Sequence, residues 1–473
     1  MATFFITTIE CAYKKSPLLA KKWGGIEMLS IIGFSTIFAI VFLLIRGKIS
    51  PIIGLVIIPI LGAILAGFGI AEIGTFFNDG ISRVMSVVIM FIFAILYFGV
   101  MQDAGLFDPI INKMVKLSRG NVIAVAAGTV IVAAIAHLDG SGASTFLITI
   151  PALLPLYKRL NMSPYLLLLL VGTSASIINM VPWGGPLGRT AAVLGVDPTE
   201  LWRPLIPLQI VALILLVGMA VLLGIREQRR IARKVENESY VLEAAATIEA
   251  SEVEAKFNEK KKATESLLRP KLLWLNLLIT IGIVAMLVWG IIPAGFVFMI
   301  GLSIVLPLNY PKVDLQMERI RAHAPNALLM ASIILAAGSF LGILSGTGML
   351  DSLAKELVLL LPAVVVPYLH IIIGVLGVPF ELILNTDAYY FALLPVVEQI
   401  VTGYGVEAAS AAYAMMIGNI IGTFISPFSP ALWLALGLAG LEMGRHIRYS
   451  FFWVWGFSVV LIVVAIVMGI IRF

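Results

Sequence analysis

Long apolar runs constrain this chain more than any other feature of its sequence. Residues 28–45 (MLSIIGFSTIFAIVFLLI), 84–101 (VMSVVIMFIFAILYFGVM) and 272–292 contain no charged side chain. A helix of about 20 such residues crosses a hydrocarbon layer roughly 30 Å thick. With 60% hydrophobic and only 12% charged residues among 473, the chain lies outside the range of soluble globular domains. The sequence therefore predicts an all-α polytopic protein of the inner (plasma) membrane.

The two halves of the chain repeat the same order of elements. FGVMQDAGLFDPIINKMV (98–115) resembles LGILSGTGMLDSLAKELV (341–358) in its glycines and its aspartate. The tetrapeptide ALLP occurs at 152–155 and again at 392–395, and Asn179 matches Asn419. We therefore predict an N-terminal segment (1–25), two repeats (26–226 and 272–473) and a cytoplasmic linker (227–271) between the repeats.

Basic residues place equivalent loops of the two repeats on opposite sides. Residues 46–48, 112–119, 158–159 and 226–271 are basic, whereas their second-half counterparts are nearly free of Lys and Arg. The segment 309–322 in the second half is basic, whereas its counterpart in the first half has no Lys or Arg. Because Lys and Arg mark the cytoplasmic side, the pattern predicts inverted-topology repeats, an architecture of secondary transporters. The four lysines within residues 1–25 do not fit this scheme, which puts the N-terminus outside.

Polar stretches inside two apolar segments predict re-entrant hairpins. HLDGSGASTFL (137–147) lies between basic residues at 119 and 159, so the chain must enter the membrane and return to the same side. Its tip is expected near 138–145, where irregular backbone is tolerated only against protein or a cavity. The second hairpin has its tip near 381–388. The prediction is about 10–12 transmembrane helices plus two hairpins.

The hairpin tips and the helix breaks that follow them supply the candidate binding residues. Free amide groups at helix ends hold anions, and exposed carbonyls and carboxylates hold cations. Proline pairs at 182/186 and 427/430 interrupt the spans after each hairpin and free further backbone groups. The candidate substrate-binding residues are Ser141, Gly142, Ser144, Thr145, Asn179, Gly184, Gly185, Arg189, Asn385, Thr386, Ser426 and Ser429.

Four ionisable side chains are candidates for coupling transport to ions. A charge inside a membrane is costly, so function is its default explanation. The candidates are Asp139, Asp387, His137 and Glu381. The two aspartates are also the candidate metal ligands, and Glu381 is a candidate proton acceptor. The alternative for Asp139 is a carboxylate that only pairs with His137.

Three further ionisable residues receive different interpretations. Arg189 suits bidentate binding of a carboxylate, and the alternative is an anchor at the membrane surface. His323 and His446 are expected in solvated polar loops. The single cysteine, Cys11, excludes an intrachain disulfide.

At these residues the chain resembles the CitMHS family of bacterial citrate:metal symporters, within the ion transporter superfamily that includes divalent-anion:sodium symporters. The matching stretches are FAILYFGVMQDAGLFDP, LDGSGAST, MVPWGGPLGR and GNIIGTFISPFSPALWLALGL, within residues 28–225 and 272–471. The resemblance implies proton-driven uptake of citrate complexed with a divalent cation. It also implies a homodimer whose transport domains move as elevators against a scaffold. In the related sodium symporters, Ser-Asn-Thr motifs at the tips hold carboxylate and sodium; Ser144, Thr145, Asn385 and Thr386 resemble them.

The chain departs from the family pattern at the first tip, where Ser141 stands in place of a second aspartate. One carboxylate fewer weakens an all-oxygen site for a divalent metal, although oxygen ligands still favour Mg or Ca, possible co-transported cations, over softer metals. No covalently bound cofactor is expected. The alternatives within transport are a sodium-coupled carboxylate symporter and a cation/proton antiporter of the same superfamily.

Other classes of function lack the residues they need. The sequence has no phosphate loop, zinc motif or nucleophile elbow, which argues against an ATP-driven pump and against an intramembrane enzyme. A passive channel is disfavoured because hairpin tips obstruct a continuous pore. The net charge of +5 comes from basic residues at span ends, so no nucleic-acid partner is expected. The expected partners are a small carboxylate anion, cations and the lipid bilayer.

Overall fold

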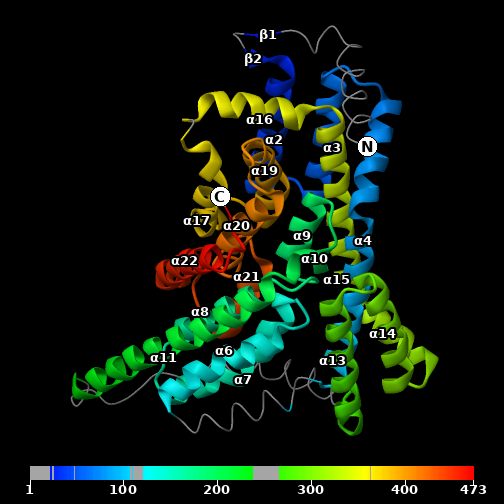
Figure 1. The fold of residues 1–473 in the computed structure, drawn as a ribbon. Coiled ribbons are helices and arrows are strands. Elements are labelled where there is room, and N and C mark those ends of the chain that lie inside the picture. Colours follow the sequence, from blue (N-terminus) through cyan, green and yellow to red (C-terminus); the bar gives the residue numbers. More distant parts are fainter. Residues whose placement is uncertain are drawn as a thin grey trace.

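The computed structural model describes residues 22–23, 26–46, 48–106, 109, 121–237, 266–362 and 364–472. These residues are mainly helical, with one short strand pair, β1 (Lys22–Trp23) and β2 (Ile26–Glu27). Most of the predicted N-terminal segment, the basic stretch 112–119 and the linker residues 238–265 lie outside the described residues. Figure 1 shows α3, α4 and α15 side by side, with α6, α7, α11 and α22 leaning away from them.

The first half begins with three helices and continues through a helical hairpin and a broken span. Ser50 caps α3 through its side chain and Asn121 caps α6 in the same way, as expected for short polar residues before helices. The helices are α2 (Met28–Ile45), α3 (Pro51–Leu65), α4 (Ile70–Asp103), α6 (Val122–Ala136), α7 (Gly142–Arg159), α8 (Pro164–Ile178), α9 (Gly185–Leu194), α10 (Pro198–Trp202) and α11 (Leu205–Asn237).

The second half repeats this order. Its long helix α15 has 34 residues, the same length as α4. The elements are η1 (Pro270–Leu272), α13 (Leu273–Trp289), α14 (Ala294–Asn309), α15 (Val313–Gly346), α16 (Met349–Leu360), η2 (Val366–Tyr368), α17 (Leu369–Val375), α18 (Gly377–Glu381), the π-helix η3 (Ala388–Leu393), α19 (Leu394–Thr402), α20 (Ala408–Ile420), α21 (Pro430–Ala439) and α22 (Met443–Val467).

The equivalent helices α4 and α15 pack against each other in opposite directions. Gly80 meets Gly338, and a Cβ at Gly80 would overlap the Gly338 carbonyl oxygen. Further along α4, Gly99 meets His323. As the residue number increases along α4, the number of the contacting residue on α15 decreases, so the two helices are antiparallel. Small residues allow this close approach of two backbones, and the opposite directions match the inverted relation predicted from charge.

Glycines at equivalent positions end equivalent helices. Gly195 ends α9 and Gly440 ends α21, each with φ 66°. This left-handed conformation strains residues that carry a Cβ. The two halves are therefore alike also at Gly195 and Gly440, which lie outside the sequence matches described above.

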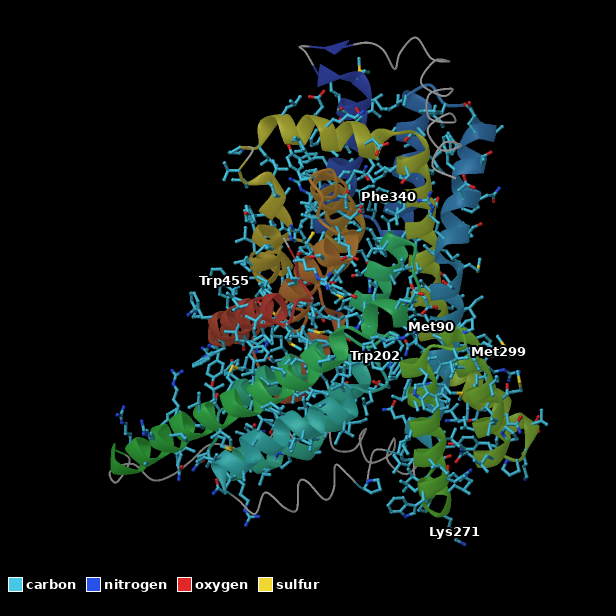
Figure 2. All side chains as sticks on the ribbon, viewed as in Figure 1. Met90, Trp202, Lys271, Met299, Phe340 and Trp455 are labelled. Atoms are coloured by element: carbon cyan, nitrogen blue, oxygen red, sulfur yellow. The ribbon has the colours of Figure 1, made fainter. Side chains whose placement is uncertain are left out.

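The apolar helices have the lengths and surfaces of a membrane protein. In the described part of the chain, five are long and apolar enough to cross a membrane, and further apolar helices have 10–17 residues. Trp274 and Ile291 are more than four-fifths exposed, as expected for side chains that face lipid. Met90 and Phe340 fill the interior, whereas Lys271 lies at one end of the molecule (Figure 2). The predicted all-α polytopic class is confirmed.

Helix α11 continues beyond the predicted end of the first repeat at residue 226. It reaches Asn237 without interruption, because the charged residues that suggested a linker also favour helix. The boundary between repeat and linker remains a prediction.

Candidate functional site

The first hairpin tip is the five-residue turn between α6 and α7. Gly140 adopts φ 71°, and a Cβ there would lie 3.1 Å from Trp183. The hydroxyl of Ser141 accepts a 3.4 Å hydrogen bond from the amide of Ser144 and so caps α7. The tip turns at residues 137–141, within and just before the predicted stretch.

His137 fastens this tip to the neighbouring helix break. Its buried ring has Nδ1 2.6 Å from the Thr145 hydroxyl and Nε2 2.8 Å from Asn179 Oδ1. Asp139 instead accepts a 2.9 Å hydrogen bond from the amide of Ser141. The alternative of an Asp139–His137 pair is therefore wrong, because both ring nitrogens are already occupied.

The helix break between α8 and α9 packs against the same tip. Trp183 donates a 2.7 Å hydrogen bond from Nε1 to the Leu138 carbonyl oxygen. Gly184 lies so close to the backbone of Asn179 that a Cβ would overlap it. Gly184 thus permits close packing within the break.

The second tip joins α18 to the π-helix η3. Asn385 accepts a 2.8 Å hydrogen bond from the amide of Ala388. Asp387 forms an ion pair with Arg189, 2.7 Å from Nε, and both side chains are about one-tenth exposed. This pair links the break of the first repeat to the tip of the second. The burial of Arg189 argues against its alternative role as an anchor at the membrane surface. The π-helical turn of η3, which follows Asp387, is of a kind that is frequent at functional sites.

Glu381, at the end of α18, is buried, and its carboxyl group meets no hydrogen-bond criterion with any residue that the structure describes. It is 1% exposed, and neither carboxylate oxygen has a hydrogen-bond partner among the described residues. Its backbone oxygen accepts a 2.7 Å hydrogen bond from Ser426. Asn419 donates a 3.2 Å bond to Gly377, and its Oδ1 also lacks a partner in the described part of the chain.

A cavity of about 380 Å³ lies between the first tip, the helix break and the pair α4 and α15. Eight predicted residues line it: Asp139, Ser141, Gly142, Ser144, Asn179, Gly185, Arg189 and Thr386. The other candidates are not among its lining residues: His137, Thr145, Gly184, Glu381, Asn385, Asp387, Ser426 and Ser429. The structure thus brings the first tip and its helix break to the cavity, whereas Thr386 is the one candidate of the second tip that lines it.

The structure adds lining residues that the sequence analysis did not select. The polar ones are Gln102, His323, Asn326 and Thr423. The signal for Gln102, His323 and Asn326 is helical spacing along α4 and α15, which becomes informative only once those helices are known to face the tips. Thr423 lies in the break between α20 and α21.

Both histidines assigned to solvated loops lie in helices, so that prediction is wrong. His323 belongs to α15, with Nε2 2.8 Å from Asp103, which also pairs with Arg319 at 3.3 Å. His446 is fully buried in α22, with Nε2 3.2 Å from the Phe424 carbonyl oxygen. Charged residues around each histidine resemble a loop in sequence, yet they are good helix formers.

Metal-binding groups are sparse near the cavity. Among the residues that the structure describes, no three His, Cys, Asp or Glu side chains cluster to hold a metal ion. A divalent cation in the cavity would therefore take few ligands from the protein and the rest from the substrate bound with it. Small hard cations commonly bind in this way, through one or two carboxylates together with the substrate.

Comparison with known sequences gives one family. The citrate transporter family CitMHS matches residues 34–418. The chain is 36% identical over 446 residues to a citrate transporter of Bacillus subtilis, covering 94% of this chain and all of that protein. It is 35% identical over 442 residues to the Mg(2+)/citrate complex secondary transporter of the same organism, with 93% and 99% of the two chains covered.

Comparison with solved structures supports the fold. The YdaH transporter of Alcanivorax borkumensis superposes with a TM-score of 0.55 at 16% identity, over 85% of this chain and 90% of that one. The sequence matches extend over both repeats and include the tips and breaks that surround the cavity. The chain belongs to the citrate transporter family.

Proposed function

We propose that the chain imports citrate, or a similar carboxylate, as its complex with a divalent cation and by symport with protons. As a member of a transporter family, it is a multi-pass membrane protein and not an enzyme, and in a bacterium it lies in the plasma membrane. The observation that carries the proposal is the cavity with Asp139 on one wall and a paired Arg189 on another. Its volume suits a small ligand.

The charge of the cavity favours a metal complex over the free anion. Among the residues that the structure describes, three ionisable side chains line it, namely Asp139, Arg189 and His323. The charge of Arg189 is offset by Asp387 at 2.7 Å, which leaves the carboxylate of Asp139. A free trivalent anion would be repelled by this carboxylate, whereas a bound divalent cation lowers the charge of the complex and attracts Asp139.

The residues of the first tip suit the cation in this complex. Asp139 offers a carboxylate, and Ser141 and Ser144 offer hydroxyl oxygens. These hard ligands favour Mg²⁺ or Ca²⁺. The cation is cargo in this proposal, since citrate itself supplies most of its ligands. One relative, the Mg(2+)/citrate complex secondary transporter of Bacillus subtilis, supports the same interpretation.

We assign the proton to Glu381. An ionised carboxylate without partners in an apolar interior costs several kcal/mol, and protonation removes most of this cost. The side chains of Asn419 and Ser426 lie near the Glu381 carboxyl group, and the charges of Arg189 and Asp387 are within its electrostatic reach. A proton on Glu381 would also provide the donor that the unpaired Oδ1 of Asn419 lacks.

The remaining ion-coupling candidates then hold the site together. His137 joins the first tip to its helix break, and Asp387 positions Arg189. We further propose that the hairpins and breaks move as a transport domain against α4 and α15, because the cavity lies at that boundary. The homodimer is part of this proposal and rests on the family resemblance.

The test is uptake of radiolabelled citrate into proteoliposomes that contain the purified chain. Uptake is measured with and without Mg²⁺ or Ca²⁺, under an imposed proton gradient or sodium gradient. The proposal predicts uptake that needs a divalent cation and is driven by the proton gradient. Uptake driven only by sodium would favour the sodium-coupled alternative, and cation exchange without citrate would favour the antiporter.

A further inference from the structure

The outer end of α11 carries a basic face that the citrate cavity does not use. Its arginines recur at spacings of three, one and three residues, which places them on one side of the helix. They are Arg226, Arg229, Arg230 and Arg233. Figure 1 shows this end of α11 projecting from the helices around it.

These arginines line a separate cavity of about 840 Å³, here called the arginine cavity. Polar and apolar groups complete its wall. They are Glu227, Ser163, Tyr449, Leu222, Leu223 and Ile225. The cavity therefore combines several positive charges with an aliphatic side.

One of these arginines, Arg230, has a structural role. Arg230 lies 2.7 Å from Glu227 and donates a 2.7 Å hydrogen bond to the Asn161 carbonyl oxygen. Glu227 is 4% exposed and also accepts a hydrogen bond from the amide of Ser163. This neutral pair fastens α11 to the turn between α7 and α8 and contributes no net charge to the cavity.

The other three arginines have no ion-pair partner among the described residues. Arg226 lies 5.9 Å from the centre of the Trp453 ring, a cation–π contact that adds no negative charge. Arg229 and Arg233 are exposed. Three like charges around one cavity repel each other, so an anion there would relieve the repulsion.

The arginine cavity lies where an apolar helix becomes polar. Residues Leu205–Arg233 are long and apolar enough to span a membrane. Beside the cavity, Leu222 is 66% exposed, and Phe452 on α22 is 74% exposed. Tyr449 and Trp453 are of the type that lies at membrane surfaces. The guanidinium groups therefore lie at the polar edge of a surface that faces hydrocarbon.

We propose that the arginine cavity binds the phosphate group of an anionic phospholipid such as phosphatidylglycerol. Guanidinium groups bind phosphate oxygens in a bidentate manner, and the acyl chains would lie along Leu222. A free phosphate shares the first interaction but not the second. Basic clusters next to a span commonly attract anionic lipids in this way.

The experiment is native mass spectrometry of the purified full chain in detergent, titrated with phosphatidylglycerol, phosphatidylcholine or inorganic phosphate. The test variant is Arg226→Gln/Arg229→Gln/Arg233→Gln. The matched control, Lys271→Gln/Lys312→Gln/Arg321→Gln, removes three exposed cations elsewhere. Arg230 is kept because its pair with Glu227 supports the fold.

We expect the wild type and the control to bind phosphatidylglycerol more tightly than phosphatidylcholine. The test variant should lose about tenfold or more in affinity for phosphatidylglycerol. An unchanged affinity in the test variant would overturn the proposal. Binding of inorganic phosphate without any preference for the lipid would overturn it as well and would indicate a soluble phosphate ligand.

Discussion

The two hairpin tips hold equivalent places in the two repeats, yet their buried ionisable groups are satisfied differently. At the start of the first tip, His137 has both nitrogens in contact with polar partners, one of them Asn179. Before the second, Glu381 has neither carboxylate oxygen paired in the described residues, although Asn419 is the repeat partner of Asn179. The difference suggests that one repeat fixes its tip permanently and the other keeps a group free to bind and release a proton.

For the aspartates of the two tips the contrast is reversed: the one in the first tip faces the cavity, and the one in the second tip is paired. Asp139 lines the cavity and accepts a hydrogen bond from a backbone amide of its own turn. Asp387 is not among the lining residues and pairs with Arg189. In the function that we propose, the first tip offers a carboxylate to the cargo, whereas the second uses its carboxylate to hold a cationic side chain in place.

The largest expected effect follows from breaking the ion pair between Arg189, beside the first helix break, and Asp387, in the second tip. Arg189→Ala leaves Asp387 unpaired in a buried site, which should lower the free energy of unfolding in detergent by about 3–5 kcal/mol. Chemical unfolding followed by tryptophan fluorescence would measure it. The double variant Arg189→Met/Asp387→Leu should recover most of the loss. A double variant less stable than Arg189→Ala would show that the pair is not the source of the effect.

A smaller effect is expected at the first tip. Asp139→Asn removes the charge that we assign to the cation, an interaction of about 1.5–3 kcal/mol, so the apparent affinity for magnesium citrate should fall by about 10- to 100-fold. Uptake measured against substrate concentration tests this change. Glu398→Gln, on α19 and outside the cavity lining, is the matched control. Equal affinity in Asp139→Asn and the control would remove Asp139 from the cation site.

The smallest effect is expected at His137. His137→Gln keeps an amide where the ring stood but loses at least one of two hydrogen bonds, worth about 1 kcal/mol. The thermal unfolding midpoint should fall modestly, while the number of protons carried with each citrate should stay as in the wild type. A lower proton number would break the comparison, because His137 would then take part in coupling.

The sequence was sufficient for features that depend on local pattern. Apolar length predicted the helices, and polar residues within an apolar stretch placed the first tip near 138–145, which overlaps the turn at 137–141. Matched residues such as Asn179 and Asn419 revealed the repeat. The antiparallel packing of α4 and α15 then agreed with the prediction from loop charge.

Other features depend on contacts between distant segments and could not be predicted. Arg189 and Asp387 are 198 residues apart, and neither position indicates the other. His323 reaches the cavity because α15 begins at Val313 and carries a charged stretch into the site. Sequence pattern alone cannot separate such a helix from a polar loop, since charged residues suit both.

The most direct test of the account counts the protons that enter with each citrate. Proteoliposomes that contain the wild type or Glu381→Gln would hold a pH-sensitive dye and receive radiolabelled magnesium citrate. We expect Glu381→Gln to exchange internal for external citrate still, but to carry fewer protons per citrate and to lose stimulation by a proton gradient. A variant that carries as many protons per citrate as the wild type would contradict the assignment of the proton to Glu381.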